Sequence, residues 1–121
     1  MALIVNTVIK RPGIFSVTPI GSIDTPGHAA FQEKVDSVLS QNPDVVIFDL
    51  EFTEYINSMG IRVLVKAKKA MKQRGGKIVF IHLQPQIKKV FDILNALPSL
   101  KVFASIQELD TYLDAMQKKA R

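Results

Sequence analysis

A serine, Ser58, stands in a stretch where polar groups directly follow a strongly apolar run, Val45–Phe48. In α/β sheets, binding sites form beyond the carboxyl ends of parallel strands, and Ser58 follows such an end. Its place at the start of an amphipathic segment predicts a helix N-cap, because a serine hydroxyl can accept hydrogen bonds from the first free backbone amides. The same hydroxyl is a nucleophile and a phosphate acceptor, so capping and chemistry are the two interpretations of Ser58.

Other reactive groups give little support to an enzyme. The chain has no cysteine, which excludes disulfides, thiolate metal sites and a cysteine nucleophile. The two histidines, His28 and His82, lack metal-ligand spacing, and no nucleophile elbow supports a catalytic triad with Ser58. The glycine-rich phosphate loops of nucleotide enzymes are also absent from the sequence. We therefore expect no enzyme activity, no metal site and no cofactor.

Length and composition predict one domain over residues 1–121. Hydrophobic residues make up 47% and charged residues 22%, an ordinary globular balance. The formal net charge is +5, but the basic residues of Lys66–Arg74 have no interleaved aromatics for base stacking. We expect a solvated face or a surface for an acidic partner there, and no nucleic acid. No signal peptide and no apolar run of about 18 residues is found, which predicts a cytoplasmic chain without membrane insertion.

Hydrophobic periodicity divides the chain into elements that would position Ser58. Strands are predicted at Leu3–Lys10, Gly13–Ile20, Val45–Leu50, Lys77–Leu83 and Lys101–Phe103. Helices are predicted to begin at the N-cap Thr25, at Ser58, at Pro85 and at the capping box of Ser105 and Glu108. The order ββαβαβαβα predicts an α/β fold, with a mixed, mostly parallel sheet, an N-terminal β-hairpin and four helices.

The same periodicity predicts how the core is built. The strand at Val45–Leu50 should lie in the centre, between the strands near 14–20 and 77–83. Three apolar side chains of the flanking helices, Val63, Phe91 and Leu94, should pack against this sheet.

Three motifs follow one another in the order that a known family uses. They are Gly21-Ser22-Ile23-Asp24, Asn57-Ser58-Met59-Gly60-Ile61 after the strand end Phe48-Asp49-Leu50, and Arg74-Gly75-Gly76-Lys77-Ile78-Val79-Phe80. This set resembles the STAS family of bacterial anti-sigma factor antagonists and extends over nearly the whole chain. Asn57 stands where the family has Asp, and Met59 stands where it has Ser or Thr. The first change removes a negative charge and the second removes a hydroxyl.

The resemblance implies a binding module for bacterial signalling. It places Ser58 at the family's phosphorylated serine. It implies a partner-binding surface made of Asp24, Thr25, Asn57, Ser58, Met59, Gly60 and Arg62. The implied partner is an anti-sigma factor of the serine kinase type, with a serine phosphatase as a second partner, and the chain would be a monomer or a weak dimer. An alternative is a STAS adaptor subunit of a lipid-transport or membrane complex without a phosphorylation switch.

Overall fold

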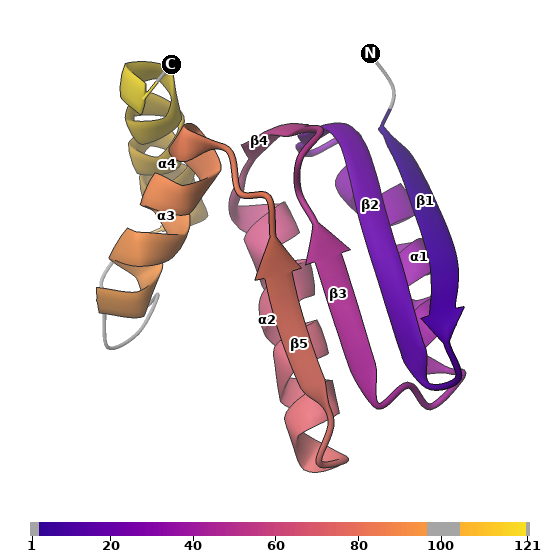
Figure 1. Ribbon diagram of the computed structural model, residues 1–121. Coiled ribbons are helices and arrows are strands. Elements are labelled where there is room, and N and C mark those ends of the chain that lie inside the picture. Colours follow the sequence, from indigo (N-terminus) through magenta and orange to yellow (C-terminus); the bar gives the residue numbers. More distant parts are fainter. Residues whose placement is uncertain (1–2, 97–104, 121) are drawn as a thin grey trace.

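The computed structural model describes residues 3–96 and 105–120. In chain order, its elements are β1 (Ile4–Arg11), β2 (Ile14–Ile23), α1 (His28–Leu39), β3 (Val45–Asp49), β4 (Thr53–Ile56), α2 (Ser58–Gln73), β5 (Lys77–Ile81), α3 (Pro85–Ala96) and α4 (Ile106–Ala120). The strands form one five-stranded sheet with helices packed against it (Figure 1).

Strand β2 organises the sheet because it pairs with three other strands. It pairs with β1 in an antiparallel hairpin, whose turn uses Gly13 at a φ of 80°, a conformation that favours glycine. The first half of β2 pairs in parallel with β3, and its second half pairs in parallel with β4. Strand β5 continues the parallel sheet beside β3. The predicted mixed, mostly parallel sheet with an N-terminal hairpin is confirmed.

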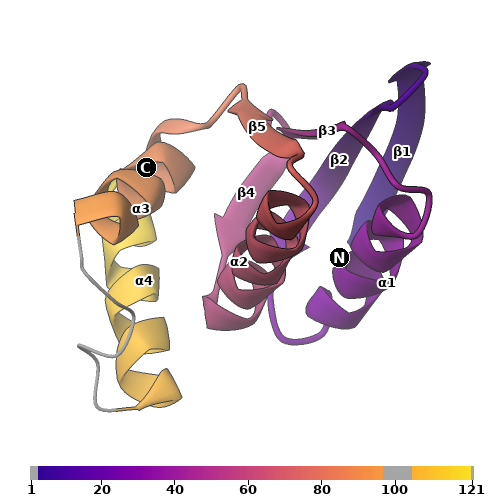
Figure 2. The ribbon, with the colours of Figure 1, turned by 90° about the horizontal axis from the view of Figure 1, so that it is seen from below.

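Helices α1 and α2 lie side by side on one face of the sheet (Figures 1 and 2). As predicted, α2 turns one face inward, where Val63 is buried, and turns Arg62 and Lys69 outward. The opposite face of the sheet is open in Figure 1, and Val8 and Val79 are exposed. Helices α3 and α4 pack against each other beside β4 (Figure 2).

Four phenylalanines connect α1 to α3 through the central strands. The ring centroids of Phe31 and Phe48 lie 6.0 Å apart, those of Phe48 and Phe80 lie 5.6 Å apart, and those of Phe80 and Phe91 lie 5.0 Å apart. Because Phe48 pairs with Val17 on β2 and with Phe80 on β5, the prediction of a central third strand is confirmed. Phe91 is only half-buried, at the end of the row.

Strand β4 was not predicted, because we expected a loop between the central strand and α2. It forms because Thr53 Oγ1 donates to the carbonyl of Pro19 at 3.1 Å and Gly21 N donates to the carbonyl of Phe52 at 3.0 Å. The predicted strand Lys101–Phe103 and the side chain of Leu94 lie outside what the structure describes, so the described element order is ββαββαβαα.

The start of α1 also differs from the prediction. Thr25 was expected to cap this helix with Pro26 in its first turn, but α1 begins at His28 with Gly27 as N-cap and no side-chain cap. Asp24 closes the preceding turn instead, because its Oδ1 accepts a hydrogen bond from Gly27 N at 3.0 Å. The Thr25 hydroxyl instead accepts a hydrogen bond from the side chain of Asn57.

Candidate functional site

The ends of β2 and β4 bring two distant loops together. The strands run in parallel, with Ser22 opposite Tyr55 and Ile23 opposite Ile56. Asn57 N then donates to the carbonyl of Ile23 at 3.0 Å. The ends of β2 and β4 therefore leave the sheet at the same edge, which places the Asp24 loop beside the start of α2.

Asn57, and not Ser58, caps α2. Its backbone is extended, and its Oδ1 accepts hydrogen bonds from Met59 N at 3.1 Å and Gly60 N at 3.2 Å. Its Nδ2 donates to Thr25 Oγ1 at 3.2 Å, which ties the two loops together. The prediction that Ser58 is the N-cap is wrong, because the amide side chain one residue earlier satisfies the first free amides of the helix.

Ser58 is the first residue of α2 and is only 1% exposed. Its backbone N–H donates to Asp110 Oδ1 of α4 at 2.8 Å. Its hydroxyl is buried and has no hydrogen-bond partner among the residues that the structure describes. The hydroxyl is therefore neither an exposed surface group nor a cap. Most buried polar side chains have a hydrogen-bond partner, and this hydroxyl has none among the described residues.

Helix α4 covers this region through residues that the sequence did not single out. The side chain of Gln117 is 1% exposed, its Oε1 accepts from Ile56 N at 2.9 Å, and its Nε2 donates to the Ile56 carbonyl at 2.7 Å. One side chain thus satisfies both backbone groups of Ile56, as a neighbouring strand would. Its position four residues after the buried Leu113 was the sequence signal for an inward-facing side chain.

The surroundings of Tyr55 are acidic. Burial raises the pKa of Tyr55 above its ordinary value of 10.0, and the negative charges of Asp114, Asp110 and Asp24 raise it further, as does a hydrogen bond to Asp114. These three carboxylates come from two segments that converge near Ser58. A further anion introduced at Ser58 would enter a region that already carries negative charge.

The remaining predicted site residues divide between interior and surface. Gly60 is buried, and a Cβ at this position would lie 2.5 Å from Cγ2 of Ile23 and 2.8 Å from Cγ1 of Ile56. Gly60 therefore lets α2 approach β2 and β4 and offers no side chain to a partner. Met59 is partly exposed and Arg62 is exposed, so both are accessible.

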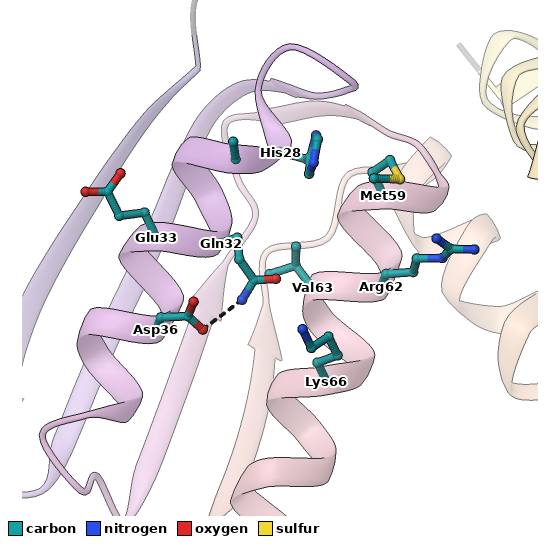
Figure 3. Close-up of a pocket in the computed structure, with 9 residues that line it drawn as sticks. His28, Gln32, Glu33, Asp36, Met59, Arg62, Val63 and Lys66 are labelled. Atoms are coloured by element: carbon teal, nitrogen blue, oxygen red, sulfur yellow. Dashed lines mark hydrogen bonds between the residues drawn. The ribbon is translucent and has the colours of Figure 1, made fainter.

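Met59 and Arg62 line a groove between α1 and α2 with a volume of about 660 Å³ (Figure 3). The other lining residues are His28, Ala29, Gln32, Glu33, Asp36, Val63 and Lys66. The α1 wall carries acidic groups, and Gln32 Nε2 donates to Asp36 Oδ1 there at 2.8 Å, whereas the α2 wall is basic. The groove can therefore accept a polypeptide segment that presents both charges.

The two histidines lie in separate places. His28 Nδ1 lies 2.7 Å from the carbonyl oxygen of Thr25, and His82 Nδ1 lies 3.0 Å from Asp49 Oδ1. Asp49, Glu51 and His82 offer ligand atoms within 4.8 Å of one another, a grouping that could approach a cation. Glu51 and His82 are exposed, so water competes at this group. Within residues 3–96 and 105–120, no helix has the length and apolar character that crossing a membrane requires.

Comparison with known proteins gives consistent matches. A model of the STAS domain matches residues 7–109. BtrV of Bordetella bronchiseptica is 25% identical over 87 residues, which cover 72% of this chain and 75% of BtrV. The anti-sigma-F factor antagonist RsfB of Mycobacterium tuberculosis is 29% identical over 67 residues, which span only 55% of each protein.

The fold is also shared with the Bacillus anti-sigma factor antagonist SpoIIAA. Its unphosphorylated form has a TM-score of 0.65 at 14% identity, and the match covers 74% of this chain and 83% of SpoIIAA. Its phosphorylated form has a TM-score of 0.64 at the same 14% identity, over 74% of this chain and 82% of SpoIIAA. At this identity the likeness concerns the fold alone. Because the family model spans most of the sequence and the sheet and helices agree with it, the chain belongs to the STAS domain family.

Proposed function

We propose that this chain is an anti-sigma factor antagonist, which binds an anti-sigma factor and so releases a sigma factor for transcription. The observation that carries the proposal is the convergence of the Asp24–Thr25 loop and the start of α2, tied by the hydrogen bond from Asn57 to Thr25. Similarity to BtrV and RsfB supports the same class of function. The proposed activity is binding and not catalysis.

The proposed partner surface consists of the accessible members of the predicted set. Thr25 and Arg62 are exposed, and Asp24 and Met59 are partly exposed. Of these, Met59 and Arg62 open onto the groove between α1 and α2. An apolar thioether beside a guanidinium is a combination that protein interfaces favour. Gly60 is not part of this surface but positions it, because the absence of a side chain lets α2 lie close to the sheet.

We further propose that Ser58 is phosphorylated by a serine-kinase-type anti-sigma factor and restored by a serine phosphatase. A phosphate adds about −1.5 to −2 charges at neutral pH. The carboxylates of Asp24 and Asp110 already influence this region, so the added charge would be poorly compensated. A partner that covers the site would have to bury that charge, which costs several kcal/mol when it is unpaired.

A pull-down from the source cell, with mass spectrometry of the captured proteins and of Ser58, tests both parts of the proposal. The captured partner would then be titrated by calorimetry against the Arg62→Ala variant. We expect its binding to weaken about tenfold or more, as for a central interface arginine. Lys69→Ala is the matched control, because Lys69 is exposed on the same helix but lies outside the groove. Equal binding of both variants would place the interface elsewhere.

A constitutive STAS adaptor subunit is the second candidate, and the burial of Ser58 favours it. Ser58 is 1% exposed and its hydroxyl is buried, so it cannot enter a kinase active site without movement of its surroundings. If purified protein from the source cell never carries phosphate on Ser58 and co-purifies with membrane proteins, the adaptor function replaces the switch.

A further inference from the structure

One side of helix α4, which carries both polar and apolar residues, faces the start of α2 and the end of β4. Asp110, Leu113 and Gln117 are spaced at i, i+3 and i+7, which places them on one side of the helix. Leu113 and Gln117 are buried and Asp110 is partly buried, so this side is the inner one.

Polar contacts attach this face to the backbone on both sides of Asn57. Asp110 Oδ1 accepts from Ser58 N at 2.8 Å, and the amide of Gln117 forms hydrogen bonds of 2.9 Å and 2.7 Å with N and O of Ile56. The hydrogen bond between Tyr55 and Asp114 adds a fourth contact. Hydrogen bonds with ionised partners are stronger than those between neutral groups. We therefore expect the bond from Ser58 N to Asp110 to be the strongest of these contacts.

From these contacts we infer that α4 is an intramolecular lid that shields the Ser58 hydroxyl, with Gln117 and Asp110 as its clasp. The hydroxyl is buried and has no hydrogen-bond partner in the described part of the chain, so coverage is the one restraint on it that these residues show. The shielding itself is independent of any partner. Its regulatory role, which is to control the access of a kinase to Ser58, rests on the proposed function.

The clasp and a phosphate on Ser58 exclude each other. Asp110 occupies Ser58 N, one of the amides at the positive end of α2 that would otherwise attract an anion. A phosphate on the same residue would compete for this amide and repel the carboxylate of Asp110. The lid must therefore open before phosphorylation, and the phosphorylated protein holds it open.

The absence of cysteine makes the lid directly measurable. In the Ser58→Cys variant of this 121-residue chain the new thiol is the single one in the sequence, and its reaction with Ellman's reagent reports exposure of position 58. Ser37→Cys provides the reference, because Ser37 is exposed on α1. We expect the thiol at position 58 to react at least about tenfold more slowly than the thiol at position 37, which corresponds to about 1.4 kcal/mol of protection. Equal rates would overturn the lid.

A second variant tests the clasp without changing any charge near the thiol. Gln117→Ala in the Ser58→Cys background should raise the labelling rate several-fold, whereas Gln107→Ala should not, because Gln107 is exposed on the same helix. Melting curves ensure that both proteins are folded at the assay temperature, and the comparison of positions 58 and 37 stands even if Gln117→Ala unfolds. An unchanged rate in folded Gln117→Ala would refute the clasp.

The dependent step is tested separately with the captured kinase. Gln117→Ala should be phosphorylated on Ser58 faster than the unmodified sequence. Slow labelling of the thiol together with no phosphorylation of either protein would retain the lid and reject the kinase switch. Fast labelling with efficient phosphorylation would retain the switch and reject the lid.

Discussion

The capping role of Asn57 gives a stability prediction with a defined size. Replacing Asn57 with Ala removes the acceptor for Met59 N and Gly60 N and the donor to Thr25. Loss of an N-cap typically costs about 0.5–2 kcal/mol. Gly60 N is buried and cannot turn to water, so an unsatisfied donor adds to the cost. With both contributions, we expect Asn57→Ala to lower the free energy of unfolding by about 2–3 kcal/mol.

Urea unfolding followed by far-UV circular dichroism measures this loss, provided the slope with denaturant is unchanged. Ser105→Ala is the matched control, because Ser105 Oγ accepts from Glu108 N at 3.1 Å at the exposed start of α4. That exposed cap should cost about 0.5–1 kcal/mol, at the low end of the range. If Asn57→Ala cost no more than Ser105→Ala, the assignment of Asn57 as the cap of α2 would be wrong.

Three further outcomes are expected. Gly60→Ala should destabilise the fold by about 1–3 kcal/mol in urea unfolding through overpacking against Ile23, whereas Gly76→Ala should cost less because its nearest neighbour is the flexible end of Met71. The raised pKa of Tyr55 means that the unfolded chain releases this proton first as the pH rises above 10, so stability should fall there, and Tyr55→Phe should make the fall less steep in unfolding measured against pH. Calorimetry should show that Ser58→Ala binds the partner like the unmodified protein and that Ser58→Asp binds it at least about tenfold more weakly; equal affinities would reject the phosphorylation switch.

Local signals in the sequence were sufficient for much of the fold. The turn at Gly13 and the one-sided apolar face of α2 predicted the hairpin and the packing of that helix correctly, because both depend on neighbouring residues. Ser105 accepts from Glu108 N, so this half of the predicted capping box is confirmed. The two motifs around Asp24 and Asn57 also meet, as the family resemblance implied, although the pairing of β2 with β4 that joins them was not predicted.

The features that were missed depend on tertiary contacts. Strand β4 has four residues, too few for a clear alternation, and exists because the long strand β2 offers it an edge. The hydrogen bond from Ser58 to Asp110 joins residues 52 apart in the chain, and that from Ile56 to Gln117 joins residues 61 apart. No local pattern marks either pair, so the cover over Ser58 could not be predicted.

The division of roles at the start of α2 has a consequence for how a switch can operate here. Had Ser58 been the cap, a phosphate on its hydroxyl would have removed an interaction that the helix needs. Asn57 carries that interaction instead, so modification of Ser58 leaves the cap of α2 intact. Among the described residues the buried Ser58 hydroxyl has no partner, and such a group costs the folded state about 1–3 kcal/mol. Such a group is costly to retain if its role is structural, and this supports the proposal that Ser58 serves a partner and not the fold.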